Sequence, residues 1–108
     1  MTQKNRTWQE DLEQIFGGSV NQDTLEEAAE LMVSVSAIHL EYHAVCMRAL
    51  EEGIRAASKG DAVVIGIVNR SGYRVGSTNE ARELLEDFLR IYLGTFNRFT
   101  SSTVPRMH

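Results

Sequence analysis

The stretch from Asp23 to Gly60 most constrains the fold, because it reads as one long helix in a chain of only 108 residues. Asp23 and Glu26, three residues later, match the pattern of a capping box, and Gly60 suits the left-handed conformation of a helix C-cap. Apolar residues lie on most sides of the middle of this helix. Such a helix needs burial on most of its circumference, and a chain of this size can build only one core to provide it.

One apolar stripe along this stretch alternates spacings of three and four, which is typical of the seam between packed helices. Its members are Ala28, Leu31, Val35, Ile38, Tyr42, Val45 and Ala49. The other predicted elements are too short to cover this stripe, and soluble monomers rarely expose a large apolar patch. We therefore predict a symmetric dimer whose long helices pack together, with Leu31, Val35, Ile38, Tyr42 and Val45 as its interface residues.

Two shorter helices flank the long one. A helix over Thr7 to Phe16 begins at a capping box formed by Thr7 and Glu10. A second helix, from Thr78 to Phe99, follows a similar pair formed by Ser77 and Glu80. Both carry apolar residues at helical spacing, so both are expected to pack on the long helix.

Residues 62–76 predict a small β-hairpin. The run from Ala62 to Val68 is rich in β-branched residues, and the turn after it contains Gly72, which suits a positive φ. A short buried helical turn is the alternative for this run, because periodicity cannot separate the two over so few residues. The sequence thus predicts a mainly α fold in a single domain, residues 1–108, with flexible ends at about 1–6 and 100–108, completed as a helical-bundle dimer.

Composition and charge exclude several classes of protein. A formal net charge of −4 and a pI near 5.3 provide no basic surface for nucleic acid. A membrane span over the most apolar window is rejected because it holds His39, Glu41, His43 and Arg48. A single cysteine, Cys46, cannot form an intrachain disulfide, and the polar N-terminus does not read as a signal peptide. A cytoplasmic location is expected.

Three side chains of the long helix predict a metal site as one alternative. His39, His43 and Cys46 are spaced by four and three residues, which places them on one helix face. Such a pair of histidines can hold zinc or copper when a further ligand or an open position completes the site. The competing interpretation is that all three are polar members of a packed interface. The two histidines also suggest that the interface could respond to pH.

An acidic cluster provides a second alternative. The segment Thr24-Leu25-Glu26-Glu27-Ala28-Ala29-Glu30-Leu31 resembles a helix of the MazG-like and phosphoribosyl-ATP pyrophosphatase families. The resemblance implies a Mg²⁺-dependent nucleoside triphosphate pyrophosphatase, with Mg²⁺ bound by this Glu-Glu-x-x-Glu signature and by a later acidic group. The implied ligands are Glu26, Glu27, Glu30, Glu83, Glu86 and Asp87. The simpler interpretation is that carboxylates in a first turn stabilise the helix N-terminus.

The sequence favours a protein that works by association over either of these alternatives. We expect a small oligomeric interaction or regulatory module with no catalytic site and no cofactor, whose partner is a second copy of itself or another protein. A Mg²⁺-dependent pyrophosphatase is the second interpretation, and a metal-binding helical protein is the third. No partner among nucleic acids or membranes is expected.

Overall fold

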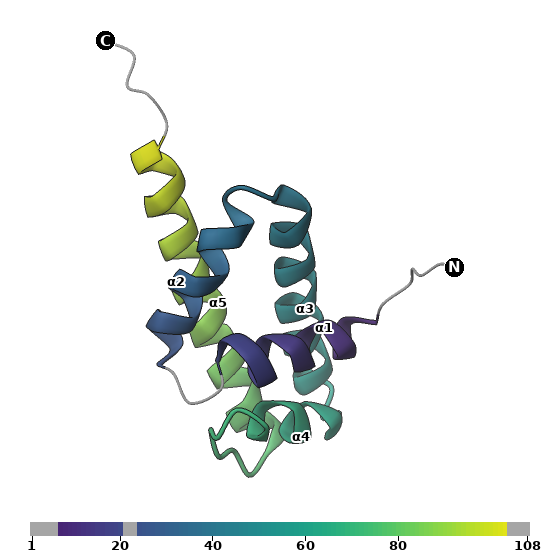
Figure 1. Cartoon of the computed structure of the whole chain (residues 1–108). Coiled ribbons are helices and arrows are strands. Elements are labelled where there is room, and N and C mark those ends of the chain that lie inside the picture. Colours follow the sequence, from purple (N-terminus) through teal and green to yellow (C-terminus); the bar gives the residue numbers. More distant parts are fainter. Residues whose placement is uncertain (1–6, 21–23, 104–108) are drawn as a thin grey trace.

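The computed structural model describes residues 7–20 and 24–103, and every element within these ranges is helical (Figure 1). The chain order is α1 (Trp8–Gln14), a short π-helix η1 (Ile15–Ser19), α2 (Leu25–Ser36), α3 (Leu40–Ser58), α4 (Val63–Asn69) and α5 (Thr78–Thr103). The mainly α fold predicted from the sequence is confirmed.

The first two α-helices begin at capping boxes. The Thr7 hydroxyl accepts the Glu10 N–H at 3.2 Å, and the Glu10 carboxylate accepts the Thr7 N–H at 3.0 Å, as predicted. In α2 the box is formed by Thr24 and Glu27, at 3.0 and 3.2 Å, one residue later than the predicted pair. The predicted cap residue Asp23 lies outside the described residues.

The Thr24 hydroxyl is expected to contribute measurably to the stability of the folded protein. Replacing Thr24 by alanine removes the acceptor for the Glu27 N–H, so we expect the free energy of unfolding to fall by about 1 kcal/mol. Urea unfolding followed by circular dichroism measures this change. An unchanged midpoint would mean that water satisfies the first turn of α2 equally well.

The predicted single helix from Asp23 to Gly60 is wrong in its middle, where the chain bends. α2 ends at Ser36, and α3 begins at Leu40 after His39, which has the extended backbone angles φ −115° and ψ 95°. The Ile38 and His39 N–H groups both donate to the Val35 carbonyl, at 3.1 and 2.8 Å, and this closes the last turn of α2. The predicted C-terminus is correct, since Gly60 has φ +81° just beyond α3.

The predicted β-hairpin at residues 62–76 is also wrong. Residues 63–69 form α4, and no strand occurs in residues 7–20 or 24–103. Val64, Ile67 and Val68 are buried at helical spacing, so the β-branched residues pack as one face of a short helix. The loop after α4 is held by the Asn69 side chain, which accepts the Val75 N–H at 2.9 Å and donates to the Val75 carbonyl at 3.2 Å. Gly72 does take a positive φ, +95°, in this loop.

The last helix is longer than predicted. Ser77 accepts the Glu80 N–H at 3.1 Å as expected, but the Glu80 carboxylate accepts the Gly76 N–H rather than that of Ser77. α5 runs to Thr103, four residues past the predicted end at Phe99. Residues 1–6 and 104–108 lie outside the described residues, so the flexibility predicted for the ends remains a prediction there.

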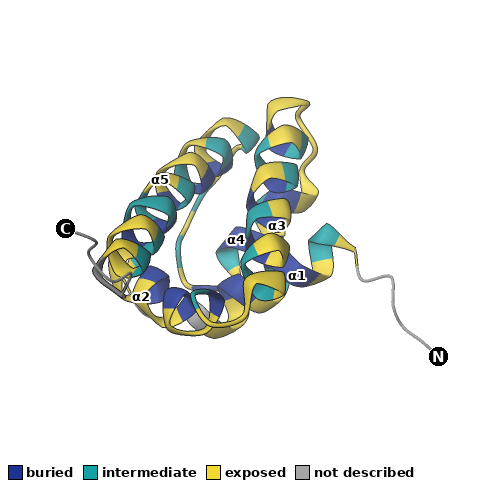
Figure 2. Ribbon diagram, turned by 90° about the horizontal axis from the view of Figure 1, so that it is seen from above, coloured by how far each residue is buried: buried dark blue, intermediate teal, exposed yellow. Residues whose placement is uncertain are grey.

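The core is built around α5, which packs against both α2 and α3 (Figure 1). α1 crosses α3, and α4 closes the end of the bundle away from the α2–α3 bend. In Figure 2 the buried residues lie on the inward sides of α2, α3 and α5, with exposed residues on their outer sides. Phe16 and Phe88 meet edge to face in this core, with ring centroids 5.8 Å apart. The α2–α3 bend thus lies at the end of the bundle opposite α4.

Among residues 7–20 and 24–103, no helix combines the length and the apolar character that crossing a bilayer requires.

Candidate functional site

A set of exposed apolar side chains surrounds the α2–α3 bend. Ile38 is 73% exposed and Leu40 is 64% exposed, although both are large aliphatic residues. We call the following set the bend face: Leu31, Val35, Ile38, Leu40 and Val45. They are five of the seven large apolar residues that are exposed in the part of the chain that the structure describes.

Four of the five predicted interface residues belong to the bend face. Leu31 and Val35 lie one turn apart on α2, Ile38 follows in the bend, and Val45 lies on α3. The fifth, Tyr42, is half-buried. The opposite side of α2 packs into the core through Ala28, Ala29, Met32, Val33 and Ser36. The bend face is thus a second apolar surface, outside the core that the monomer completes.

Directly behind the bend, three polar side chains from three helices meet on one oxygen. The Tyr92 hydroxyl of α5 donates to Ser36 Oγ at 2.9 Å, and His43 Nδ1 lies 2.7 Å from the same hydroxyl oxygen. His43 Nδ1 and the Tyr92 hydroxyl are hydrogen-bonded to each other, and the tautomer of the imidazole decides which of the two donates. We call Ser36, His43 and Tyr92 the tyrosine clasp. It ties the last turn of α2 and the first turn of α3 to α5.

Aromatic stacking fixes the histidine of the clasp. The His43 ring lies almost parallel to that of Phe96, with an interplanar angle of 11° and centroids 3.9 Å apart. It also stacks on the Tyr92 ring, with centroids 5.6 Å apart. This packing leaves the imidazole half-buried between α3 and α5. The arrangement positions His43 as a structural group rather than as one open to a ligand.

Burial raises the pKa of two groups, the Cys46 thiol beside the clasp and the Tyr92 hydroxyl within it. Cys46 is fully buried on α3, and this burial raises the pKa of its thiol from 9.0 to about 11, against the opposing effect of hydrogen bonds from Tyr42 and Tyr92. Burial also raises the pKa of the Tyr92 hydroxyl from 10.0 to about 12. Both groups are therefore neutral at physiological pH, and the Cys46 thiol is not activated as a nucleophile.

The structure separates the predicted metal ligands His39, His43 and Cys46. The bend removes His39 from the helix that carries the other two, and its side chain is exposed at the N-cap of α3. His43 Nδ1 is engaged by Tyr92, and Cys46 is buried. Within residues 7–20 and 24–103, no three His, Cys, Asp or Glu side chains are grouped in a way that could hold a metal ion. The zinc or copper interpretation gains no support.

The acidic side chains of the MazG-like resemblance are likewise not grouped among the described residues. Glu26, Glu27 and Glu30 are exposed on α2, where Glu27 serves the capping box. On α5, Glu86 pairs with Arg82 at 3.2 Å and Asp87 pairs with Arg90 at 3.2 Å. Glu83 accepts a hydrogen bond from Asn79 at 3.5 Å. Four of the six groups interact with a neighbour on their own helix, and the geometry lends no support to a Mg²⁺ centre.

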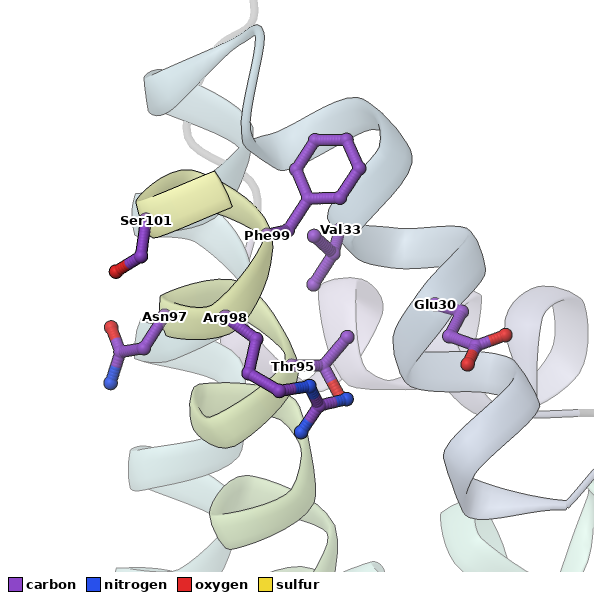
Figure 3. Close-up of a pocket in the computed structure, with 7 residues that line it drawn as sticks. All are labelled: Glu30, Val33, Thr95, Asn97, Arg98, Phe99 and Ser101. Atoms are coloured by element: carbon purple, nitrogen blue, oxygen red, sulfur yellow. The ribbon is translucent and has the colours of Figure 1, made fainter. Parts of the chain in front are cut away.

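A groove of about 810 Å³ runs between α2 and the C-terminal turns of α5 (Figure 3). It is lined by Glu30, Val33, Thr95, Asn97, Arg98, Phe99 and Ser101. In Figure 3, Phe99 and Val33 lie close together, whereas Asn97 and Ser101 point away from α2. The volume lies in the range of small-molecule sites, about 300–1,000 Å³, but the polar groups do not converge as such a site requires. The bend face remains the better candidate.

Two participants in the candidate site were missed by sequence reasoning. Nothing in the sequence links the Tyr92 hydroxyl to Ser36, which is 56 residues away. Leu40 is not among the predicted interface residues, and the bend exposes it. A signal for the clasp does exist, because Ser36 and His43 are polar residues within otherwise apolar stripes.

Comparison with models of known protein families gave no match, and no significant match was found among curated proteins or among solved structures.

Proposed function

We propose that this protein is a self-associating interaction module that acts through helix–helix contacts of its bend face, in a reducing cytoplasm where Cys46 remains a thiol. The observation that carries the proposal is the exposure of Ile38 and Leu40, the two most exposed large apolar residues that the structure describes. A second copy of the chain is the proposed partner, because a twofold axis through the bend face would bring the same apolar residues of both copies together.

The energetics favour association of this kind. Burying an exposed isoleucine contributes about 1.5–3 kcal/mol, and a twofold interface buries the Ile38 side chain of both copies. A standard interface buries about 800 Å² on each partner, and the bend face provides an apolar centre for an interface of that size. The proposed role requires no catalytic group and no cofactor.

The substitution Ile38→Glu tests this function. Because it places a carboxylate in the centre of an apolar interface twice, we expect the dissociation constant of the dimer to rise at least about 100-fold, which corresponds to about 2.7 kcal/mol. The measurement is sedimentation equilibrium of wild type and variant over a concentration series from about 0.1 to 100 μM, a span that brackets micromolar affinity.

Val63→Glu is the matched control. Val63 is also an exposed apolar residue, 43% exposed, but it lies on α4 at the other end of the bundle. We expect this variant to associate like wild type. A wild-type protein that remains monomeric over the whole concentration range, or equal weakening by both substitutions, would refute the proposed function.

A further inference from the structure

The sequence through the bend contains no residue that breaks a helix. The chain has no glycine between Gly18 and Gly53, and its only proline is Pro105. Ala37, Ile38, His39 and Leu40 are all compatible with a continuous helix. Local sequence preference therefore favours one helix from α2 through α3, which is the prediction that the structure contradicts.

Tertiary contacts, rather than local ones, hold the bend. His39 is the N-cap of α3, but its side chain makes no capping hydrogen bond. The tyrosine clasp, in contrast, joins the residue that ends α2 to a residue in the first turn of α3 through a single hydroxyl from α5. The bend depends on the position of α5. A chain that releases the clasp has no local reason to stay bent.

The bend also interrupts the stripe that alternates spacings of three and four. In a continuous helix, Leu31, Val35, Ile38, Tyr42 and Val45 lie in one straight seam, as in a pair of coiled helices. In the bent chain the same seam is divided between α2 and α3, and four of these five side chains are exposed. The pattern in the sequence is complete only when the helix is straight.

We propose that residues 37–39 are a hinge, and that two copies associate by exchanging their N-terminal segments, α1 to α2, with residues 25–58 straightened into one helix. This inference rests on the proposed self-association and specifies its conformation. The occupant of each bend face is the second copy, arranged about a twofold axis near residue 38.

The exchange conserves the contacts of the bent chain. α2 packs against α3 and α5, and α1 packs against α3 and α4. After exchange, each of these contacts is made with the partner chain and not lost, so the core of each half is unchanged. The new contacts form at the hinge, where the two straight helices cross. The two most exposed aliphatic residues, Ile38 and Leu40, lie at this crossing.

The substitution Leu40→Pro is expected to permit the bent state and to block the straight one. Leu40 is the first residue of α3, a position that tolerates proline because its N–H has no partner within the helix. The extended angles of His39 also suit a residue that precedes proline. In a continuous helix, however, proline at this position removes a hydrogen bond and clashes with the preceding turn. The variant should therefore fold as a bent monomer. Leu40→Ala removes the same exposed side chain without blocking the helix and is the matched control.

An intrachain distance reports the state of the hinge directly. Spin labels on Glu26→Cys and Lys59→Cys, both at exposed sites, would be separated by about 50 Å along a straight helix of 1.5 Å rise per residue. In the bent chain α2 and α3 fold back from a common corner, so the separation is far shorter (Figure 1). The labelled chain is diluted with unlabelled chain so that only intrachain distances are read, and the buried Cys46 is left in place.

Tyr92→Phe provides a second variant, because it removes the hydroxyl that joins Ser36 to His43 while keeping the ring. We expect wild-type dimers to show the distance near 50 Å, Leu40→Pro to be monomeric and Leu40→Ala to retain dimers. Because the exchange remakes the clasp between the two copies, Tyr92→Phe should destabilise monomer and dimer alike and dimerise like wild type. Wild-type dimers with a short distance, or Leu40→Pro dimers as tight as wild type, would overturn the exchange and leave the proposed function standing. A wild-type monomer at all concentrations would overturn both.

Discussion

Replacing Gly53 by valine is expected to lower the free energy of unfolding by about 2–3 kcal/mol, the usual cost of overpacking. Gly53 is buried on α3 and faces both α1 and α5, so that a Cβ at this position would lie 2.9 Å from Leu12 Cδ2 and 3.2 Å from Leu85 Cδ1. Leu12 and Leu85 are both fully buried and have little space into which to move. The stiff, branched side chain of valine cannot turn away from them in a helix.

Thermal unfolding measures this effect, and the midpoint is expected to fall by roughly 10 °C or more. Gly94→Ala is the control, because Gly94 lies within α5 and a Cβ there meets nothing within 4 Å. It is expected to stabilise the protein by about 0.5–1 kcal/mol through helix propensity alone. Stabilisation by both substitutions would show that α1 does not pack against Gly53 as the structure describes.

Alkaline solution is expected to destabilise the fold. The pKa of the Cys46 thiol is raised from 9.0 to about 11, and that of the Tyr92 hydroxyl from 10.0 to about 12, in both cases mainly by burial. The folded state therefore holds these protons more tightly than the unfolded state. Their stabilising contribution is complete below pH 9 and is lost as pH rises toward 12, at a cost on the order of 2–3 kcal/mol for each group.

Urea unfolding at a series of pH values from 7 to 11 tests this dependence. In Cys46→Ala the thiol is absent, so the free energy of unfolding of this variant should fall less steeply between pH 9 and pH 11 than that of wild type. Parallel pH profiles for the two proteins would contradict the assignment of a raised pKa to the buried thiol.

Three of the helix ends could be read from the sequence, at Thr7, Gly60 and Ser77, because their signals are local. The Thr7 and Glu10 side chains form their capping box three residues apart, and Ser77 caps the Glu80 N–H in the same way. Gly60 and Gly72 both take the positive φ that turns require. A hydrogen bond between near neighbours depends little on the rest of the fold, so residue types and their spacing were sufficient.

The segment from Val63 to Val68 shows where local preference misleads. Its β-branched residues favour strands on average, but that preference reflects packing on a half-buried surface more than the backbone itself. Here α1 and α5 provide an apolar surface, and Val64, Ile67 and Val68 cover it as one side of a helix. The apolar residues of this segment also follow helical spacing, but the segment is too short for that spacing to outweigh its β-branched composition.

The bend could not be predicted because its cause lies far away in the chain. No local residue at 37–39 requires it, and the hydroxyl that holds Ser36 and His43 comes from Tyr92 on the last helix. The same distinction between local and tertiary causes applies to the candidate site. Leu31, Val35 and Ile38 of the predicted interface are exposed in the structure, and the exposure of Leu40 depends on a bend that only the tertiary fold provides.

The crossing of α1 over α3 has a spectroscopic consequence. Trp8, the only tryptophan of the chain, is half-buried at this crossing, with Cζ3 3.9 Å from the position of a Cβ on Gly53. Its indole fluorescence therefore reports on one contact, the docking of the first helix. Since no second indole dilutes the signal, detachment of α1 can be followed optically on its own while circular dichroism follows the rest of the bundle.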